Sequence, residues 1–429
     1  MRGNFPRNIL HVTHPWGGGI ETYLDDMVRM FGESCTIYYL ISDQGNLRVV
    51  HAISGKVVTY RIGKPIKLTD YHRSDYRDLV RDILDYLDIQ LVHLNSMLGH
   101  TYDLIEVAHQ KDIPIVCTIH DYYFICPTFH MVKSDGSYCV TCEVGGVDLE
   151  CLAQNSYLSC AGYDGEKLAD WRDEFRNVMG LIDEFVFPSA SARTLFEKYF
   201  KIEQLKIMVI SHGDSIQTAA DSGCPGGNEL KVGVIGSLWK HKGLSLVEYI
   251  VENNNDKDIV FFHFGDISIS SAKITKLGRY DQNKIVSLLK QYQIDVLLIL
   301  STWPETFSYT LSEAIKADIP TIVTNLGATR ERVEALGIGW VVDYHEPRKI
   351  LELLEYLKSN RNEVETRKSR LRQLEKQSLT DMKQQYLELY TRVYSGKLQG
   401  TKRSNRFAVM TRLKWRQIKK WLPIPAAML

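Results

Sequence analysis

The sequence lacks three features that would assign it to a class directly. It has no excess charge of either sign, with 52 Lys and Arg against 52 Asp and Glu, so the chain as a whole is not built to bind polyanions. It has no run of about 18 apolar residues that could span a bilayer. Its first residues, Met1–Asn8, are short, polar and basic and do not resemble a secretory leader. We therefore expect a cytoplasmic protein.

Length and composition are those of an ordinary soluble protein of two domains. The chain has 429 residues, 44% of them hydrophobic and 24% charged. Short apolar runs alternate with helix-length amphipathic segments, which predicts parallel sheets covered by helices on both faces. The expected strands are 8–13, 36–41, 57–62, 90–94, 114–119, 185–188, 207–210, 231–235, 259–264, 295–300 and 321–324. The expected helices are 21–31, 75–87, 101–110, 349–374 and 381–394.

A domain boundary is indicated by the segment DSGCPGGN at 221–228, where glycine, proline and small polar residues dominate. The two halves that it separates have a similar βα character. We expect an N-terminal domain over 1–215 with a cysteine-rich insertion at 122–165, a linker at 216–229, a second domain over 230–375, a helix at 376–398 and a basic tail at 399–429.

A glycine turn follows the first expected strand. Gly17, Gly18 and Gly19 precede a helix, so backbone amides and the positive end of the helix can approach an anion such as a diphosphate. The spacing is not that of the dinucleotide fingerprint. A tight strand-to-helix turn without a ligand explains the same residues, and the pattern alone does not decide.

The segment STWPETFSYTLSEA at 301–314 carries the most specific pattern. Glu305 falls where a strand ends, and Glu313 falls about two turns into the next helix. Both carboxylates can reach the crevice at the carboxyl ends of the strands and accept hydrogen bonds from sugar hydroxyls. The amides of Phe307, Ser308 and Tyr309 can hold phosphate oxygens at the helix start. Two solvated glutamates on a helix are the simpler alternative.

The same segment resembles the E-x7-E signature of family 4 glycosyltransferases. Other segments resemble that family in the same order, over roughly residues 8–345. They are Gly18–Ile20, Thr118–Asp121, Ser189, Ser211–Asp214, the loop GSLWKHKG at Gly236–Gly243, Asn325–Ala328 and Arg330–Val333. The combination is far more specific than any single motif.

The resemblance implies a fold and an activity. The fold is α/β of the GT-B type, with two Rossmann-like doubly wound domains facing across a cleft and a C-terminal helical extension. The activity is that of a retaining hexosyltransferase, which uses a nucleotide-sugar donor as its substrate and requires neither cofactor nor metal. The acceptor is a glycan or a lipid-linked glycan, in cell-surface polysaccharide biosynthesis. Oligomeric state and the identity of the donor are left open.

The resemblance also implies roles for individual residues. Glu305 holds the donor sugar, and Glu313 holds the ribose. Lys242 neutralises the leaving diphosphate. Gly18 and Gly19 belong to the donor-binding residues, and Gly19 donates a backbone N–H to the same diphosphate. His120 lies beside the reacting sugar, although a satisfied core histidine would explain its sequence position equally well. The remaining implied donor contacts are Gly236, Ser237, Phe307, Ser308 and Tyr309.

One position departs from the family pattern. Family members often carry arginine directly after the glycine of the phosphate loop, and here that residue is Ser237. Lys240 or His241 can compensate in part, but a lysine supplies a point charge rather than a bidentate fork. Two alternatives therefore remain beside the transferase: a catalytically silent partner protein of the same fold, and a sugar-nucleotide epimerase or phosphorylase.

Five cysteines gather in the insertion that follows His120. Cys139 and Cys142 form a C-x2-C pair, and Cys126, Cys151 and Cys160 lie near them. Such a set can bind zinc or an iron–sulfur cluster, with Cys126, Cys139, Cys142 and Cys151 as ligands. Because a second C-x2-C pair is missing, we favour reduced thiols, and we expect the insertion to shape the acceptor pocket.

The C-terminal tail is basic and amphipathic. Residues 402–420 hold eight Lys or Arg and no acid, and apolar residues recur at near-helical spacing: Phe407, Met410, Leu413, Ile418 and Trp421, with Trp415 close by. This pattern is typical of a helix on an anionic membrane surface, and we expect peripheral attachment to the inner face of the cell membrane. A solvated tail or a helix packed on the body is the alternative. Nucleic-acid binding is not indicated.

Overall fold

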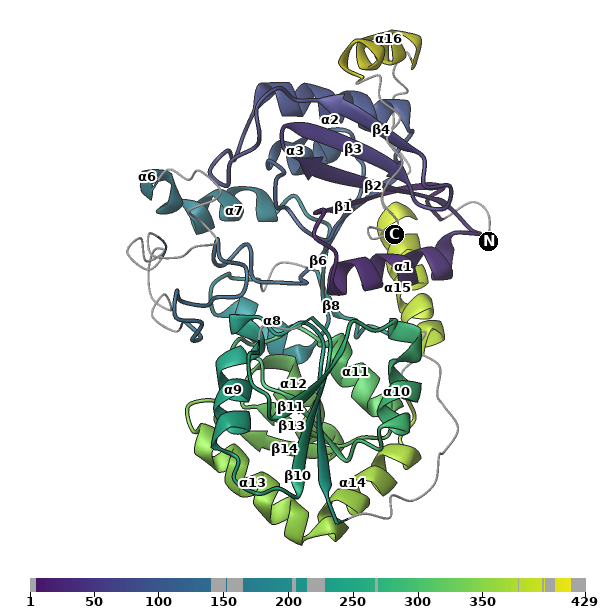
Figure 1. Cartoon of the computed structure of the whole chain (residues 1–429). Coiled ribbons are helices and arrows are strands. Elements are labelled where there is room, and N and C mark those ends of the chain that lie inside the picture. Colours follow the sequence, from purple (N-terminus) through teal and green to yellow (C-terminus); the bar gives the residue numbers. More distant parts are fainter. Residues whose placement is uncertain are drawn as a thin grey trace. The chain divides into compact units, whose positions relative to one another are not determined.

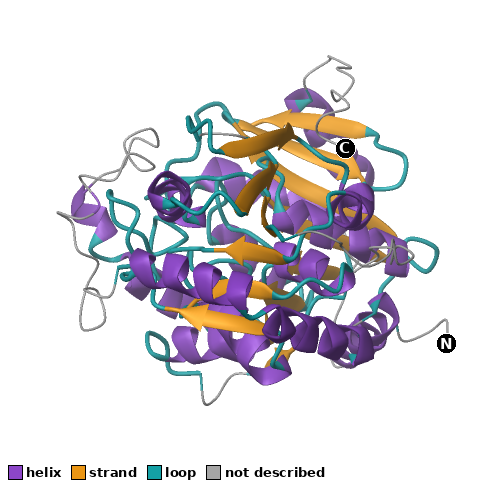
Figure 2. Ribbon diagram, turned by 60° about the horizontal axis from the view of Figure 1, so that its bottom comes forward, coloured by secondary structure: helices purple, strands orange, loops and turns teal. Residues whose placement is uncertain are grey.

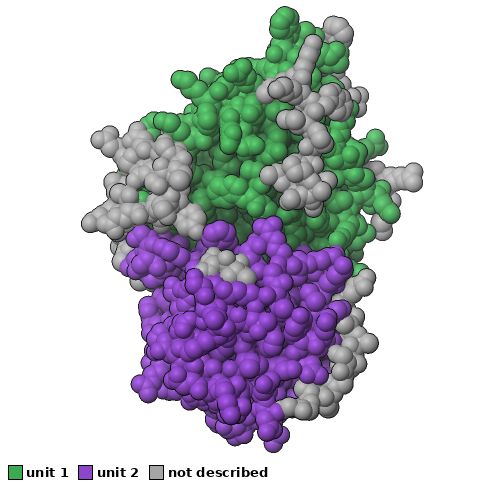
Figure 3. Space-filling view, viewed as in Figure 1, with its two compact units in different colours: residues 1–131, 140–213, 379–429 green, residues 132–139, 214–378 purple. Residues whose placement is uncertain are grey.

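The computed structural model describes residues 5–139, 152, 165–202, 206–213, 228–266, 269–376, 378–395, 397 and 406–417. The chain folds into two compact units (Figure 3). The first consists of residues 1–131, 140–213 and 379–429, and the second of residues 132–139 and 214–378. Apart from residues 228 and 229, the predicted linker at 216–229 lies outside the described residues.

The first unit is built on an eight-stranded sheet in the order β4-β3-β2-β1-β5-β6-β7-β8. The six neighbouring strands β2-β1-β5-β6-β7-β8 pair in parallel, as predicted. Strand β3, in contrast, runs antiparallel to both β2 and β4. The strands are β1 (Asn8–Thr13), β2 (Thr36–Asp43), β3 (Asn46–His51), β4 (Val57–Arg61), β5 (Leu91–Leu94), β6 (Ile115–Thr118), β7 (Glu184–Phe187) and β8 (Ile207–Val209).

The antiparallel edge arises from a two-residue turn that the sequence prediction missed. Gln44 and Gly45 both have positive φ, 46° and 83°, which is the backbone of a tight hairpin turn. The chain therefore returns at once as β3 instead of crossing over through a helix. Strand β3 was not predicted for this reason.

Helices cover both faces of this sheet (Figures 1 and 2). Helix α1 packs beside α15, and α2 packs beside α3 and α16. Their buried faces recur at helical spacing, as with Tyr23, Met27 and Met30 of α1. The helices are α1 (Gly19–Phe31), α2 (Ser74–Tyr86), α3 (Asp103–Gln110), α6 (Gly165–Leu168), α7 (Trp171–Met179), α8 (Ala190–Glu197), α15 (Leu379–Ser395) and α16 (Arg406–Arg416).

The second unit has a six-stranded, entirely parallel sheet in the order β11-β10-β9-β12-β13-β14. Four-residue strands such as β12 are buried along their whole length, as expected for a sheet covered on both faces. The strands are β9 (Leu230–Ile235), β10 (Ile259–Phe264), β11 (Ile274–Gly278), β12 (Val296–Ile299), β13 (Thr321–Thr324) and β14 (Gly339–Val342).

Two sets of helices enclose the second sheet (Figure 1). One apolar core joins the strands to α9 and α13, and cores on the other face involve α10, α11, α12 and α14. The elements are η2 (Lys240–Lys242), α9 (Leu244–Asn253), η3 (Gln282–Lys284), α10 (Ile285–Gln291), α11 (Tyr309–Lys316), α12 (Gly327–Leu336), α13 (Pro347–Ser359) and α14 (Arg361–Gln373). The predicted α/β class with two parallel-sheet units and C-terminal helices is confirmed.

The prediction of a single helix over 349–374 is wrong, because one helix ends before Asn360 and a second begins after it. Asn360 has φ −122° and ψ 60° and separates α13 from α14. Both its backbone N–H and its side-chain amide donate to the carbonyl of Tyr356, each at 2.8 Å. Asparagine competes for backbone groups in this way and so favours helix ends.

The chain exchanges segments between the two units. Residues 132–139, part of the insertion that was predicted to lie wholly in the N-terminal domain, belong to the second unit. There a bridge pairs Val132 with Tyr138, and the hydroxyl of Thr302 donates to the carbonyl of Gly136 at 2.7 Å. In the opposite direction, α15 and α16 return to the first unit.

Helix α16, the described part of the basic tail, packs on the first unit. Val409 and Leu413 are buried against it, and Arg412 pairs with Asp82 at 2.6 Å. Trp415, in contrast, is 86% exposed. Ile418 and Trp421 lie outside the described residues. In the described part of the chain, no helix has both the length and the apolar character needed to cross a bilayer.

Candidate active site

The loop between β12 and α11 carries the two predicted carboxylates of the second unit. Glu305 lies in this loop beyond the carboxyl end of β12, and Glu313 is the fifth residue of α11. Glu313 is therefore about one turn into the helix and not two, as its sequence position had suggested. Each residue is only 3% exposed. Buried carboxylates at the carboxyl ends of parallel strands are unusual unless they are paired or bind a ligand.

Lys242 is brought to Glu305 by a close approach of two chain segments. Its Nζ donates to Oε1 of Glu305 at 2.8 Å and lies 5.5 Å from the ring centre of Trp303. The next residue, Gly243, has φ 82°, and a Cβ there would come within 2.0 Å of the carbonyl oxygen of Leu300. Only glycine permits this contact, so Gly243 fixes the distance between the phosphate-loop segment and the end of β12.

The carboxylate of Glu305 is held in its charged form. Burial by itself raises its pKa, but the charge and hydrogen bond of Lys242 and the hydroxyls of Ser301 and Ser308 outweigh burial, and the pKa lies below its ordinary value. Ser301 donates directly to Oε1. An ionised carboxylate can accept hydrogen bonds from further hydroxyl groups. Ser301 was missed at the sequence level, although it directly follows the predicted strand.

Four of the predicted donor residues line one cavity of the second unit. Gly236, Ser237, Lys242 and Glu305 surround a space of about 70 Å³ together with Thr310 and the ends of β9 and β12. The structure thus brings the predicted phosphate loop to the first glutamate of the E-x7-E segment, from positions more than 60 residues apart in sequence.

The start of α11 is shaped by Arg332, which the sequence interpretation did not single out. Ser308 precedes the helix with φ 75° and has no side-chain cap. Arg332 of α12 donates to the carbonyls of Phe307 and Ser308 at 3.1 and 3.0 Å, and its guanidinium lies 4.2 Å from the centre of the Phe307 ring. Tyr309 begins α11. This arrangement directs carbonyls toward Arg332 and leaves the amide end of the helix for an anion.

Glu313 has a partner that sequence spacing alone could not reveal. The hydroxyl of Tyr280 donates to Oε2 of Glu313 at 3.0 Å. Burial, together with the charge and the hydrogen bond of Glu313, holds the pKa of Tyr280 well above its ordinary value, so the phenol stays protonated. Tyr280 thereby orients a buried carboxylate that the resemblance assigns to the ribose.

Lys240 and His241, the two residues that were expected to compensate for Ser237, differ in the charge that they can supply. His241 is buried, and burial together with the charge of Lys242 lowers its pKa to about 4, despite the opposing effect of Glu305. It is therefore neutral near pH 7 and supplies no positive charge. Lys240 is exposed in the same loop and can supply a positive charge in place of the arginine of the family pattern.

The predicted glycine turn of the first unit joins β1 to α1. Gly17 and Gly18 have φ of 72° and 82°, and Gly18 precedes the helix without any side-chain cap. The first amides of α1, beginning at Gly19, thus lie at an uncapped helix start, where an anion is favoured. The carboxylate of Glu21 folds back over the turn, since a Cβ on Gly17 would lie 2.8 Å from its Oε2.

His120 follows β6 and lies among other histidines of the first unit. Its ring centre is 4.5 Å from that of Tyr23 and 5.3 Å from that of His212. Burial, reinforced by His212, His14 and His11, holds the pKa of His120 well below its ordinary value. The imidazole is therefore neutral near pH 7 and can position a hydroxyl.

Asn95 fixes which ring nitrogen of His120 carries the proton. The Nδ2 of Asn95 lies 3.1 Å from the carbonyl oxygen of His93, which can only accept, so Nδ2 must face that group. Oδ1 then faces Nε2 of His120 at 3.3 Å. A neutral His120 hydrogen-bonded in this way carries its proton on Nε2 and keeps a lone pair on Nδ1. Asn95, directly after β5, was missed at the sequence level.

Two of the candidate cysteine ligands are described. Cys126 and Cys139 are both buried, and Sγ of Cys126 lies 3.2 Å from the hydroxyl of Thr128. Cys142, Cys151 and Cys160 lie outside the described residues. The metal hypothesis for this insertion therefore stays untested.

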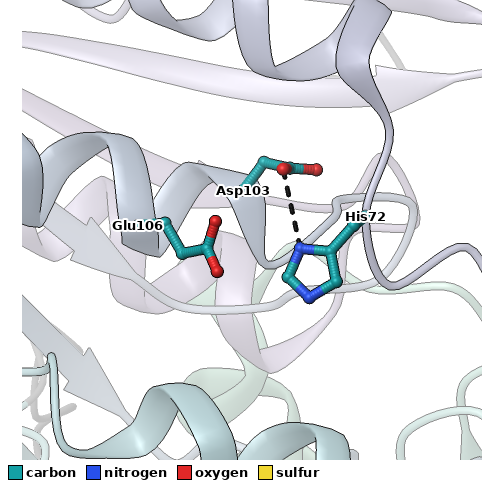
Figure 4. Close-up of side chains that lie close together, drawn as sticks. All are labelled: His72, Asp103 and Glu106. Carbon is teal, nitrogen blue, oxygen red and sulfur yellow. Dashed lines mark ion pairs between the residues drawn. The ribbon is translucent and has the colours of Figure 1, made fainter.

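A different group of possible metal ligands lies between the start of α3 and the preceding segment of the first unit. His72, Asp103 and Glu106 point toward one another (Figure 4), and Nδ1 of His72 is 3.5 Å from Asp103. Arg77, however, donates to both Asp103 and Glu106. Hydrogen bonds from His72, Thr101, Arg73 and Arg77 outweigh burial and hold the pKa of Asp103 well below its ordinary value. A guanidinium already occupies the cationic position, so we assign this group to the structure and not to a site.

Two family models match this chain. Residues 17–214 match the family model described as Glycosyltransferase Family 4, and residues 270–375 match the one described as Glycosyl transferases group 1. No curated protein matches the sequence.

Solved structures match nearly the whole chain. Sucrose-phosphate synthase from Thermosynechococcus elongatus is 13% identical with a TM-score of 0.61, covering 91% of this chain and 100% of its own. Anabaena Alr3699/HepE in complex with UDP-glucose is 12% identical with a TM-score of 0.61, covering 90% and 99%. The pneumococcal O-GlcNAc transferase GtfA in complex with UDP and GlcNAc is 11% identical with a TM-score of 0.57, also covering 90% and 99%. Fold and family models together place this chain among the family 4-like glycosyltransferases of the GT-B fold.

Proposed function

We propose that this protein transfers a hexose from a nucleotide-sugar donor to a glycan or lipid-linked glycan acceptor, with retention at the anomeric carbon and without a metal ion. The observation that carries the proposal is the hydrogen-bonded ion pair between the half-buried Lys242 and the buried Glu305 beyond the end of β12. UDP-sugar complexes of proteins with this fold, such as Alr3699/HepE with UDP-glucose, support a nucleotide-sugar donor.

The pair has the charges that such a reaction needs. In the transfer, the bond between the anomeric carbon and the diphosphate oxygen breaks, and the acceptor oxygen forms a new bond to that carbon while its proton passes to the leaving diphosphate. Negative charge develops on the diphosphate, and the ammonium group of Lys242 can neutralise it without an ion. Glu305, ionised and bonded to Ser301, can accept hydrogen bonds from hydroxyls of the transferred sugar.

The surrounding residues complete the proposed donor site of the second unit. Glu313, oriented by Tyr280, accepts the ribose hydroxyls. Gly236, Ser237 and the uncapped start of α11 near Phe307, Ser308 and Tyr309 hold phosphate oxygens through backbone amides. In the first unit, the amide of Gly19 beside Gly18 contributes to diphosphate binding, and the neutral His120 positions a sugar hydroxyl.

We further propose that the enzyme works at the surface of an anionic membrane, in the synthesis of a cell-surface polysaccharide. Support comes from α16, where Lys414 and the 86% exposed Trp415 face away from the buried Val409 and Leu413. Co-sedimentation with phosphatidylglycerol and with phosphatidylcholine vesicles tests this part. Binding to the anionic vesicles alone, lost in Trp415→Ala, is expected, and equal recovery with both kinds of vesicle would contradict it.

The donor reaction is tested with a panel of UDP-, GDP-, ADP- and dTDP-hexoses in the presence of EDTA. We expect hydrolysis or transfer with one of these donors, release of an α-linked product from an α-linked donor by NMR, and loss of turnover in Glu305→Gln. A matched control is Glu334→Gln, which changes an exposed glutamate of α12.

The silent-partner alternative predicts a different result from the same panel. Because Ser237 stands where the family often has arginine, a silent relative would bind a nucleotide and turn over none of the donors. Thermal stabilisation by UDP, GDP, ADP or dTDP without any turnover would favour that reading. Turnover that requires added Mg²⁺ or Mn²⁺ would refute the metal-independent mechanism.

A further inference from the structure

A short hairpin of the cysteine-rich insertion belongs to the second unit and contacts its proposed donor site. The hairpin consists of residues 132–139. Val132 and Tyr138 pair across it, and the backbone N–H of Lys133 donates to the carbonyl of Ser137 at 2.9 Å. The segment is therefore a closed element with its own hydrogen bonds.

The tip of the hairpin has the geometry that its residues favour. The N–H of Gly136 donates to the carbonyl of Lys133 at 3.0 Å. The carboxylate of Asp135 accepts from the N–H and from the hydroxyl of Ser137, at 2.8 and 2.7 Å. Gly136 has φ 87°, as in hairpin loops that end on a left-handed glycine. The tip thus presents the carbonyl of Gly136 in a defined direction.

Gly136 contacts two loops of the proposed donor site. Its carbonyl accepts a hydrogen bond of 2.7 Å from the hydroxyl of Thr302, in the loop after β12. A Cβ on Gly136 would lie 3.2 Å from Cβ of Lys240, in the phosphate loop. The backbone N–H of Thr302 in turn donates to the carbonyl of His241 at 3.0 Å. Because Gly136 and Thr302 are buried, loss of the bond between them would leave a polar group without water.

Thr302 stands between two residues that touch the ion pair of the site. Ser301 donates to Oε1 of Glu305, and the ring centre of Trp303 lies 5.5 Å from Nζ of Lys242. A shift of the backbone at Thr302 would therefore move a group on each partner of the pair.

We propose that the hairpin 132–139 is a positioning element of the donor site, which fixes Lys242 and Glu305 relative to each other through the hydrogen bond from Thr302 to Gly136. The hairpin acts through the backbone of residues 301–303 and not by contact with the donor. Its effect on turnover rests on the proposed function, whereas its effect on the pair does not. A displacement of about 1 Å can lower a catalytic rate by about 100-fold.

The first measurement needs no donor and follows the charge of Glu305. Glutamate carboxyl carbons are isotope-labelled and titrated by NMR, and the signal of Glu305 is assigned by its absence in Glu305→Gln. Thr302→Val removes the hydroxyl and keeps the shape of the side chain. We expect the pKa of Glu305 to rise by about 0.5–1 unit, because Lys242 and Ser301 would then hold its charge less well. Thr302→Ser, which keeps a hydroxyl, should retain the original pKa.

Gly136→Ala tests the hairpin from its own side. The new side chain would sit at φ 87° and 3.2 Å from Cβ of Lys240, so the tip has to shift. The pKa of Glu305 should rise as it does in Thr302→Val.

Two control variants make the same chemical changes elsewhere. Gly63→Ala places a side chain at φ 102° in the first unit, where a Cβ would meet nothing within 4 Å. Thr366→Val removes a hydroxyl that donates at 2.7 Å to the carbonyl of Asn362 in α14. Neither control should move the pKa of Glu305.

The second measurement is donor turnover. We expect kcat to fall about 10-fold in Thr302→Val and in Gly136→Ala and to stay within about 2-fold in Thr302→Ser. The proposal is overturned if Thr302→Val leaves the pKa of Glu305 unchanged, if Thr302→Ser shifts it as much as Thr302→Val, or if both Thr302→Val and Gly136→Ala keep full turnover. Absence of turnover in the original protein would refute the proposed function instead, and the titration would then decide alone whether the hairpin positions the pair.

Discussion

The ammonium group of Lys242 donates a 2.8 Å hydrogen bond to Oε1 of Glu305 across 63 positions of sequence. The pair joins the segment after β9 to the end of β12, and its carboxylate is 3% exposed. Lys242 keeps the carboxylate of Glu305 charged where a nucleotide sugar is proposed to bind. Removing either charge should therefore have different consequences for stability and for catalysis.

Glu305→Gln keeps the shape of the side chain and should fold normally, with donor turnover reduced by about 10²–10³-fold because a charged contact to the transferred sugar is lost. Lys242→Met leaves a buried carboxylate unpaired, and we expect a loss of about 1–3 kcal/mol in unfolding free energy besides lost turnover. Urea denaturation and donor turnover measure the two effects. Lys349→Met, which breaks the exposed pair with Glu346, is the control and should leave the unfolding free energy nearly unchanged, because exposed ion pairs contribute little. Equal effects of Lys242→Met and Lys349→Met would contradict the prediction.

Tyr280→Phe should weaken nucleotide binding with little effect on folding. The substitution removes only the hydroxyl that donates to Glu313 at 3.0 Å, and a single lost hydrogen bond corresponds to about 3–10-fold in affinity. Isothermal titration with the nucleoside diphosphate that binds best provides the measurement. Tyr356→Phe, at a 49% exposed tyrosine of α13, should leave affinity unchanged. Identical affinities of the Tyr280 variant and the original protein would show that this hydroxyl does not orient a ligand-binding carboxylate.

Asn95→Asp should raise the pKa of His120 by about 1–3 units, because a carboxylate would then face Nε2 in place of the amide oxygen at 3.3 Å. His11, His14, His212 and Tyr23 surround the same imidazole. The acid limb of the activity profile should move upward in pH by the same amount. Asn95→Ala should lower turnover without moving that limb. Titration of the imidazole by NMR checks the shift, and an unchanged pKa in Asn95→Asp would disprove the assigned contact.

Stability should fall as the pH drops from about 6.5 to about 4. Burial lowers the pKa of His100 to about 4 and that of His11 to about 3. The unfolded chain takes up protons near pH 6.5 while the folded state does not, so each such group costs about 1.4 kcal/mol per pH unit below that value. Above pH 6.5 this contribution to stability is complete. Urea denaturation at several pH values measures the slope of the unfolding free energy against pH. His100→Gln should reduce this slope by the contribution of one histidine. A flat profile between pH 4 and pH 6.5 would be incompatible with neutral buried histidines.

Much of the fold was predictable from the sequence because its strands are short apolar runs with clear ends. Strands 259–264 and 321–324 were predicted at the bounds of β10 and β13. The hairpin strand β3 was missed because Gln44 and Gly45 form a turn that apolar periodicity does not reveal. The break at Asn360 was missed because a single asparagine is tolerated within many helices.

The residues that chemistry places in the site were easier to predict than those that orient them. Glu305 and Lys242 stand in motifs with characteristic spacing, and the structure places them in contact. Tyr280, Arg332 and Asn95 act through contacts with residues 20 or more positions away. No local pattern marks such partners, because they are selected by tertiary packing.

The return of α15 to the first unit means that this unit is assembled from both ends of the chain. The hydroxyl of Tyr390 lies 2.6 Å from Nδ1 of His93, and Tyr386 and Tyr390 are fully buried there. During synthesis, residues 379–395 leave the ribosome after the whole of the second sheet. The N-terminal sheet must therefore wait for its last covering helix, with apolar surface exposed, while the later-synthesised unit can already fold.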